Sequence, residues 1–403
     1  MIPNEIPGFN FDLGETVDLL RDTVRSFSDD EIAPRANLIE QNNDFPKDLW
    51  TKLGDIGVLG ITVEEEYGGA GMGYLEHVVA LEEISRASAA VGLSYSAHSN
   101  LCVNQLRLNG NEEQKKKFLP DLISGEKVGA LAMSETGAGS DVVGMKTIAT
   151  KNGDRFILNG SKMWITNGII DDEGTPADIV WLYARTGTDE RGRAEITTFL
   201  IESGMEGYSA GQKIEDKLGM RASTTAELVF ENCVVPSENI VGMPGESKIH
   251  LMRNLEHERV ALAAMSVGIS RRCLADMNSY ASEREAFGKQ IRNFGQIQRH
   301  IGESWADYRA MRAYVYDTAR QIDLSKAGQR LDSDGVKLFA TTVAKNIADK
   351  AIQVMGGYGY VGEYVVERLW RDAKLLEIGG GTIESHQKNI TKDLSTNSSA
   401  IEQ

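Results

Sequence analysis

The sequence predicts an α+β protein in which helices and strands occupy separate blocks of the chain. Residues 1–125 and 241–403 contain long runs with apolar residues at spacings of three and four, which is the helical period. Residues 126–240 contain shorter runs rich in β-branched and aromatic residues, separated by Gly, Asp and Asn. Because segregated blocks are typical of α+β folds, we expect a helical domain, a β domain and a second helical domain with these boundaries.

Composition narrows the classes of function. The chain has 403 residues, 41% of them apolar, which is enough for a large core. Acidic residues exceed basic ones by 59 to 43, so the formal charge of -16 argues against a nucleic-acid partner. The three cysteines have no paired spacing, and we therefore expect neither a disulfide framework nor a metal site.

No window approaches the roughly 18 uncharged apolar residues of a membrane span, and we expect no stable membrane insertion. The first fifteen residues lack the basic flank and apolar run of a secretory signal. We expect a cytoplasmic protein if the chain is bacterial, or a mitochondrial matrix protein if it is a processed eukaryotic chain.

In the first block, residues 14–34 have helical periodicity that ends at a proline, and residues 74–98 read as one long helix. In the middle block, residues 154–168 predict two strands joined at Asn159-Gly160, a dipeptide typical of hairpins. Trp164 and Thr166 share a face of the second strand by the two-residue alternation. They could line a flat aromatic cofactor or simply form a sheet face.

In the last block, residues 303–322 and 336–355 predict long helices. The segment 282–291 predicts a helix broken at Gly288. Arg284 in that segment could bind an anion through its planar guanidinium, or it could lie on an ordinary solvated face.

One carboxylate interrupts an apolar helical stripe. Glu258 lies between Leu255 and Leu262, and the stripe comprises Leu251, Leu255, Leu262, Met265 and Ile269. A carboxylate facing a core is costly, and burial raises its pKa toward the range of a general base. The alternative is a structural ion pair or a subunit interface.

Three glycine-rich segments are candidates for ligand contact. Residues 357–362 satisfy the dinucleotide pattern GxGxxG, but they follow a helical run instead of a strand, which argues against a Rossmann site. Residues 134–142, SETGAGSDV, are either a ligand-binding loop or a polar turn. Residues 377–384, EIGGGTIE, place three glycines directly after a predicted helix.

Six motifs, in this order and spacing, resemble those of the acyl-CoA dehydrogenase family over nearly the whole chain: ALAMSETGAGSD, KMWITNG, DKLGMRAS, REAFGKQI, QVMGGYGY and RDAKLLEIGGGT. The resemblance implies a helical N-terminal domain, a middle β-barrel or β-sheet domain and a C-terminal four-helix bundle, assembled as a homotetramer with one FAD per subunit. It implies an enzyme that removes hydrogens from the α and β carbons of an acyl-CoA and passes electrons to an electron-transferring flavoprotein.

The resemblance also implies the residues that bind FAD. Those of the middle domain are Leu131, Met133, Ser134, Gly139, Ser140, Trp164, Ile165 and Thr166. Those of the last block are Arg284, Phe287, Gln353, Gly356 and Gly357, which hold the adenine half mostly from a neighbouring subunit, together with Thr382 and Glu384. Gly295 stands where the family has a glutamine that contacts FAD.

Straight-chain members of the family carry the catalytic glutamate in a motif like IYEGT, where this chain has IGGGT, so Gly380 cannot accept the proton. Other members carry the base on an earlier helix in a segment like LDLERL. The matching segment here is LEHERV, which assigns the base to Glu258. The substrate residues implied by the resemblance are Ser140, Leu93, Ala97, Arg259, Gly379 and Gly380.

Straight-chain members of the family carry a bulky aromatic residue at the position of Gly379, so the resemblance implies room for a branched acyl group. Leu93 and Ala97 match positions at the other end of the pocket and would shorten it. We therefore expect a short branched substrate, first isovaleryl-CoA, which would yield 3-methylcrotonyl-CoA in leucine catabolism. Ile249 stands where relatives with that substrate have a tyrosine, and another branched or terpenoid acyl-CoA remains an alternative. Two further alternatives are an acyl-CoA oxidase and a flavin-binding homologue without catalysis.

Overall fold

The computed structural model describes residues 11–322, 326 and 328–401. Residues 1–10, the larger part of the segment in which we expected no secretory signal, lie outside the described part. Helices fill the chain from Glu15 to Ser124, strands fill it from Gly129 to Val241, and helices return from Lys248. The expected α+β order is confirmed. Within the described residues, no helix is long and apolar enough to cross a membrane.

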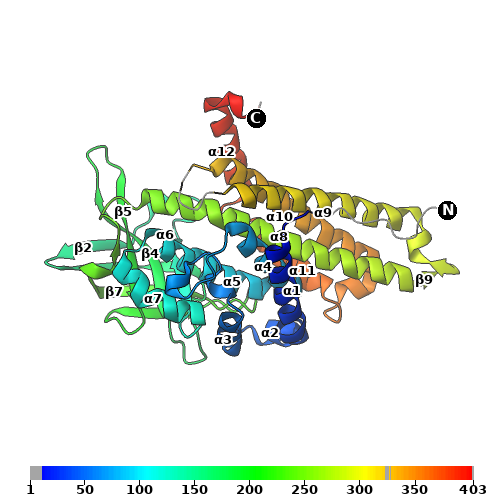
Figure 1. Ribbon diagram of the computed structural model, residues 1–403, viewed down its shortest axis with the longest axis horizontal. Helices are drawn as coiled ribbons and strands as arrows, with labels where there is room; N and C mark the ends of the chain where they lie inside the picture. Colours follow the sequence, from blue (N-terminus) through cyan, green and yellow to red (C-terminus); the bar gives the residue numbers. More distant parts are fainter. Residues whose placement is uncertain (1–10, 323–325, 327, 402–403) are drawn as a thin grey trace.

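The N-terminal helices form one side of the molecule (Figure 1). They are α1 (Glu15–Phe27), α2 (Ala36–Asn42), α3 (Asp48–Asp55), α4 (Tyr74–Ala87), α5 (Ala89–His98), α6 (Asn104–Asn109) and α7 (Glu112–Ser124). The predicted single helix over 74–98 is wrong, because Ser88 is extended between α4 and α5. Its hydroxyl accepts a hydrogen bond from the Val91 amide and so begins α5 as an N-cap.

The middle domain is a mixed, open sheet. Its strands are β1 (Gly129–Ala132), β2 (Ile148–Asn152), β3 (Arg155–Thr166), β4 (Ile179–Thr188), β5 (Ala194–Glu202), β6 (Tyr208–Lys213), β7 (Thr225–Pro236) and β8 (Ile240–Val241). The order is β6-β7-β3-β2-β4-β5-β8, and β1 pairs with β4 in parallel. A barrel would require β6 and β8 to pair with each other, and they remain the two ends of the path. The sheet alternative is therefore confirmed, and the barrel is wrong.

The predicted hairpin at Asn159-Gly160 is also wrong. Strand β3 continues through this dipeptide, with a register shift between Leu158 and Gly160 against β7. A Cβ at Gly160 would lie 2.7 Å from Thr147 Oγ1, so the glycine permits a close approach at a bulge. The turn between β2 and β3 lies instead at Gly153, whose φ is 65°.

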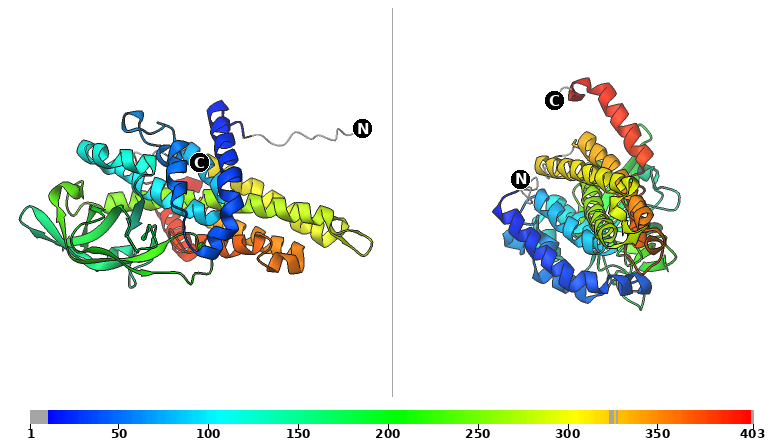
Figure 2. Two further views of the ribbon diagram at one scale, coloured as in Figure 1. Left: turned by 90° about the horizontal axis from the view of Figure 1, so that it is seen from below. Right: turned by 90° about the vertical axis from the view of Figure 1, so that its right-hand side faces the viewer.

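The C-terminal domain is built on four helices that pack against each other: α8 (Lys248–Glu283), α9 (Gly295–Gln321), α10 (Arg330–Met355) and α11 (Val366–Leu376). The left view of Figure 2 shows this bundle extending away from the sheet, and the right view shows α12 (Ile383–Thr396) projecting from the body. The segment 282–291 is not a broken helix. It forms a hairpin of β9 (Glu285–Ala286) and β10 (Lys289–Gln290), because Phe287 and Gly288 both have positive φ.

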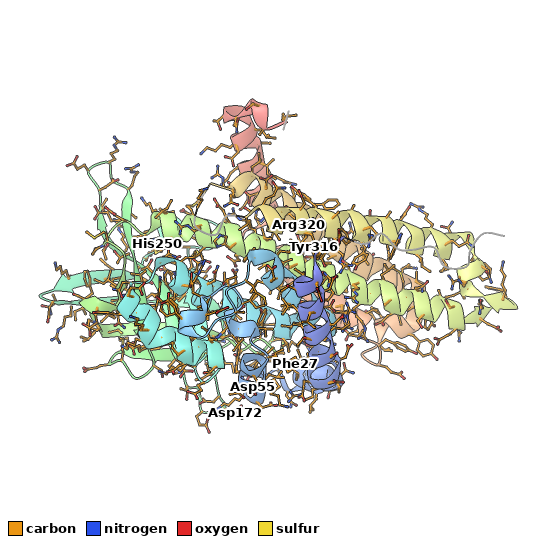
Figure 3. All side chains as sticks on the ribbon, viewed as in Figure 1. Phe27, Asp55, Asp172, His250, Tyr316 and Arg320 are labelled. Carbon is orange, nitrogen blue, oxygen red and sulfur yellow. The ribbon has the colours of Figure 1, made fainter. Side chains whose placement is uncertain are left out.

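Helices α4 and α8 hold the N-terminal helices and the bundle together. Glu83 on α4 is buried and pairs with Arg25 on α1 at 3.2 Å and with Arg271 on α8 at 2.6 Å. Tyr316 on α9 accepts a hydrogen bond from Arg21 at 2.9 Å, and Figure 3 shows it where α9 meets α1. At Gly268 the two helices are so close that a Cβ would lie 2.4 Å from the Glu82 carbonyl oxygen.

We predict that Gly268→Val destabilises the protein by about 2 kcal/mol or more, because the added side chain must push α4 away from α8. Gly302→Ala is the matched control. It lies exposed inside α9, where an added Cβ would meet nothing within 4 Å, and should instead stabilise by about 0.5–1 kcal/mol. Chemical unfolding of both variants measures this, and equal stability of Gly268→Val and the parent would contradict the close packing.

Candidate active site

A cavity of about 140 Å³ lies where the sheet, α5, α8 and the segment after α11 meet. It brings together residues that are far apart in the chain. They are Ala97, Leu131, Met133, Ser134, Gly139, Val142, Trp164, Ile165, Thr166, Leu255, Glu258, Gly380 and Gly381. Ten of these thirteen are residues that the sequence had assigned to a base, a cofactor or a substrate.

Glu258 is the carboxylate of this cavity. It lies one turn after Leu255 on α8, and both side chains line the cavity as the stripe predicts. Burial raises the pKa of Glu258, while the positive charges of Arg259 and Lys337 act in the opposite direction. A carboxyl group whose pKa is raised toward neutral pH is a stronger base than an ordinary surface carboxylate.

The glycine segment packs directly against this carboxylate. Gly380 has a φ of 64° and Gly381 a φ of 104°. A Cβ at Gly380 would lie 3.4 Å from both Cγ and Cδ of Glu258 and 2.6 Å from Cδ1 of Leu262. Gly380, which has no side chain that could act as a base, therefore lies next to the Glu258 carboxylate. Within the described part of the chain, the Gly380 and Gly381 amides donate no hydrogen bond to protein, and both remain free for a ligand oxygen.

The opposite wall comes from β1, β3 and the loop after β1. Trp164 has a left-handed backbone conformation, with a φ of 66°, at a bulge in β3. Its indole is 59% exposed, and Ile165 and Thr166 beside it also line the cavity. Trp164 and Thr166, predicted to share a face of the strand, both line this cavity, and the register shift of β3 against β7 falls between Lys162 and Ile165.

A buried lysine supports this wall. Lys162 Nζ donates to the Met133 carbonyl oxygen at 3.0 Å and pairs with Glu135 Oε1 at 2.8 Å. The Glu135 carboxylate also accepts hydrogen bonds from the amides of Lys146 and Thr147. These bonds fix the chain on both sides of Ser134 and hold it against β3, where the Met163 amide donates to the Ser134 carbonyl oxygen at 2.9 Å.

Several predicted residues do not line the cavity. Arg259 is buried on another side of α8, where it pairs with Asp334 at 3.2 Å. Thr382 is the N-cap of α12 and accepts a hydrogen bond from the Ser385 amide. Leu93 is half-buried against the core, Gly379 is half-buried, and Ser140 and Glu384 are exposed.

A second group of predicted residues meets at the far end of α8. Arg284, Gly356 and Gly357 line a cavity of about 570 Å³. Tyr280 and Tyr358 also line it, with their ring centroids 6.1 Å apart. Phe287, 95% exposed at the hairpin tip, and Gln353, exposed on α10, lie outside its lining.

The GxGxxG pattern of residues 357–362 does not form the strand–turn–helix of a dinucleotide-binding site. Residues Gly356–Tyr360 form a 3₁₀ turn directly after α10, with no strand before them. Gly295, which replaces the family's glutamine, is exposed at the start of α9. Ile249 is half-exposed in the first turn of α8 and lines a different cavity, not the one that contains Glu258.

Sequence reasoning did not assign Val142, Leu255 or Gly381 to the site, although Leu255 was part of the stripe. It also missed Asp334, Lys337 and His386, which lie buried behind the glycine segment. The available signal was the one that selected Glu258: Lys337 interrupts a helical series of buried apolar residues, Ala340, Ala344 and Ile347. Within the described residues, no cluster of His, Cys, Asp or Glu could hold a metal ion, and the three cysteines are free and buried.

Residues 14–126, 130–233 and 250–395 match the N-terminal, middle and C-terminal domains of acyl-CoA dehydrogenases. The chain is 50% identical to the mitochondrial isovaleryl-CoA dehydrogenase of Arabidopsis thaliana over 93% of its own length and 90% of that protein. The chain belongs to the acyl-CoA dehydrogenase family. It is also 46% identical to the mitochondrial 2-methylacyl-CoA dehydrogenase of Solanum tuberosum, over 95% of this chain and 91% of that one.

Solved structures of the family agree with this fold. Butyryl-CoA dehydrogenase of Megasphaera elsdenii superposes with a TM-score of 0.90 at 35% identity, covering 96% of this chain and all of that one. A chain from the structure of the electron transferring flavoprotein of Acidaminococcus fermentans gives 0.89 at 35% identity, covering 96% and 99%. An acyl-CoA dehydrogenase of Bacillus anthracis, complexed with FAD, gives 0.88 at 30% identity, covering 98% of this chain and 69% of that one.

We predict that Gly380→Ala destabilises the protein by about 1–3 kcal/mol, because φ is positive there and the new methyl group would lie 2.6 Å from Leu262 Cδ1. Gly379→Ala is the control, since its φ is not positive and its nearest neighbour lies 3.6 Å away. Thermal unfolding of the two variants checks the difference. A Gly380→Ala protein as stable as Gly379→Ala would argue against this geometry.

Proposed function

We propose that this chain is an FAD-dependent dehydrogenase of a short branched acyl-CoA, with isovaleryl-CoA as the first candidate substrate and 3-methylcrotonyl-CoA as the product. The observation that carries the proposal is the Glu258 carboxylate on α8, facing Gly380 across the cavity. The carboxylate therefore lies beside the position at which straight-chain members carry the base, although it is supplied from α8.

The mechanism assigns a role to each wall. Glu258 takes the proton from the α carbon of the acyl group, because its carboxylate is the one with a raised pKa in the cavity. The free amides of Gly380 and Gly381 would bind the thioester oxygen, where negative charge develops as the proton leaves. FAD, when bound, accepts the hydride from the β carbon.

The residues of the sheet wall fit the flat ring system of FAD. The exposed Trp164 indole offers a planar surface, while Ser134 and Thr166 offer hydroxyl groups at the same cavity. Met133 and Leu131 supply apolar contacts. Gly139 has no side chain, and no protein atom lies within 4 Å of the place where its Cβ would be. This position therefore leaves open space for a ligand.

The adenine half of FAD requires a second copy of the chain. At about 1.5 Å per residue, the helix from Glu258 to Arg284 spans roughly 40 Å, which is longer than one FAD. Arg284, Gly356 and Gly357 of one subunit would therefore hold the adenine half of the cofactor bound at another subunit's Trp164. We propose the homotetramer of the family as the assembly that brings them together.

Substrate selection follows from the small residues of the cavity. Ala97, Gly380 and Gly381 leave width beside the Glu258 carboxylate, while Leu255 closes the cavity with an apolar side chain. Gly379 and Leu93 would influence the width of the cavity from behind its lining, and Ser140 would contact the substrate from the exposed loop after β1. We assign Arg259 a supporting place instead of direct substrate contact, because its guanidinium pairs with Asp334.

The second candidate is a dehydrogenase for another branched or terpenoid acyl-CoA. The 2-methylacyl-CoA dehydrogenase of potato favours it, since that relative is nearly as similar as the isovaleryl-CoA enzyme of Arabidopsis.

We further propose electron-transferring flavoprotein as the electron acceptor. The compartment would be the mitochondrial matrix for a eukaryotic chain, in keeping with the mitochondrial relative of Arabidopsis, or the cytoplasm for a bacterial one.

We predict that isovaleryl-CoA bleaches the flavin of the purified protein rapidly under anaerobic conditions, and that butyryl-, octanoyl-, 2-methylbutyryl- and citronellyl-CoA react more slowly. Stopped-flow absorbance measures the rates. Fastest bleaching by 2-methylbutyryl- or citronellyl-CoA would support the second candidate. Oxygen consumption during turnover without a flavoprotein acceptor would indicate an oxidase, and a yellow protein bleached by no thioester would indicate a homologue without catalysis.

We predict that Glu258→Gln lowers the rate of flavin reduction at least about a hundredfold, because it keeps the shape of the side chain and removes the proton acceptor. FAD content and thioester binding should persist. The matched control is Glu256→Gln, a buried neighbour outside the cavity that accepts hydrogen bonds from the Gly328 and Gln329 amides. Near-normal reduction by Glu258→Gln would refute the assignment.

A further inference from the structure

The carbonyl oxygen of Gly381 accepts hydrogen bonds from two buried side chains. Lys337 Nζ on α10 donates at 2.5 Å, and the ring of His386 on α12 approaches through Nε2 at 2.9 Å. Lys337 and His386 are both 0% exposed. Gly381 itself lines the cavity beside Glu258, so both donors act on the back of the site.

These donors belong to a longer buried network. His386 Nδ1 lies 2.5 Å from Asp334 Oδ1 on α10, and the same oxygen lies 3.2 Å from Arg259 Nη1 on α8. The network therefore runs from the residue next to Glu258, through Asp334 and His386, to the Gly381 carbonyl. It joins α8, α10 and α12 to the glycine segment.

Burying this many ionisable groups is costly, because each charge loses its hydration. An apolar side chain at position 337 would pack with Ala340 and Ala344 at no such cost. Among the residues that the structure describes, no carboxylate lies within salt-bridge distance of the lysine, and its hydrogen-bond acceptor is the Gly381 carbonyl oxygen. The Lys337 ammonium group therefore interacts with the glycine segment of the active site and not with a carboxylate.

Lys337 and Glu258 also interact through their charges. The positive charge of Lys337 lowers the pKa of Glu258 against the larger, opposite effect of burial. Burial in turn lowers the pKa of Lys337 to about 8, while the Glu258 carboxylate opposes this shift. The lysine is therefore protonated at neutral pH, where the base must be ionised.

We propose that Lys337 is a positioning residue of the active site, whose ammonium group holds the Gly381 carbonyl together with His386 and places a positive charge behind the segment that contacts Glu258. This inference rests on the proposed function, since it requires Glu258 to be the base. The two hydrogen bonds to the Gly381 carbonyl fix the peptide group between Gly381 and Thr382, and so anchor the glycine segment where it lines the cavity.

Other ionisable groups face the pair and act on its titration. Those near Glu258 are Arg259 on its own helix, Tyr74 on α4 and Tyr183 on β4. Those near Lys337 are Arg259, Asp334, Glu377, Glu384 and His386. All of these groups stay in place in a variant at position 337, although loss of the lysine charge also acts on the pKa of Glu384 and of His386. Variants that keep or remove the charge at position 337 therefore need to be compared.

The test compares three variants with the FAD-loaded parent. Lys337→Met removes the charge and the hydrogen bond, Lys337→Gln removes the charge and keeps a donor, and Lys337→Arg keeps both. Lys350→Met is the matched control, since Lys350 lies on the same helix and pairs with Glu303 at the surface. The first measurement is the rate of anaerobic flavin reduction from pH 5.5 to 9.

We expect the acid limb of this profile to move upward by about half a pH unit or more in Lys337→Met and Lys337→Gln, which lowers the rate at pH 6 about threefold. The rate recovers toward pH 8. Lys337→Arg and Lys350→Met keep the acid limb of the parent. An equal loss of rate at every pH in Lys337→Met, with an unmoved limb, would assign the lysine a purely structural role and overturn the proposal.

The second measurement needs no substrate. Between about pH 8 and 10 the unfolded lysine binds a proton and the folded one does not, so the stability of the parent relative to Lys337→Gln rises with pH. Thermal unfolding across this range should show the rise in the parent and in Lys350→Met. A parent and a Lys337→Gln protein with parallel profiles would contradict the buried position of the Lys337 ammonium group against the glycine segment, from which the proposal is argued, and would overturn it.

The two proposals fail in different ways. If no thioester reduces the flavin of the parent, the proposed function fails, and the role of Lys337 fails with it. If the parent is reduced and Glu258→Gln is not, while the Lys337 variants keep the parent's pH profile, the dehydrogenase stands and only the positioning role is lost.

Discussion

The contact between the Glu258 carboxylate and the Gly380 backbone is the constraint on which the rest of the site depends. A Cβ at Gly380 would lie only 2.6 Å from Leu262 Cδ1, and φ is positive at both Gly380 and Gly381. The segment therefore passes Glu258 in a conformation that favours glycine at these two positions. The cost of burying the carboxylate is then distributed over Arg259, Lys337 and their partners on neighbouring helices.

The long helix α8 is the element that carries this arrangement. It supplies Glu258 near the sheet and ends at Arg284, and it packs on α4 so closely that only glycine fits at position 268. The sheet contributes the facing wall through a bulge at Trp164 and a buried Lys162–Glu135 pair. The catalytic geometry is therefore set by helix packing on one side and by strand irregularity on the other.

The local helical period predicted the helical blocks and singled out Glu258 as a carboxylate on an apolar stripe, while the family resemblance assigned it as the base. Sequence reasoning failed where long-range contacts decide. Gly160 marks a bulge instead of a turn because of its approach to Thr147. Whether the sheet closes into a barrel depends on pairing between its two edge strands, β6 and β8. No local sequence pattern encodes that pairing. Arg259 matched a family motif, but its ion-pair partner Asp334 lies 75 positions later, and the motif does not encode that pairing.

The length of α8 has a thermodynamic consequence. If the two halves of the cofactor site lie on different subunits, the cofactor is a ligand of the assembly and not of the single chain. Binding of FAD and association of subunits must then be reciprocally linked, so that each strengthens the other by the same free energy. Dilution alone would release the cofactor, and its affinity has no meaning apart from the concentration of the protein.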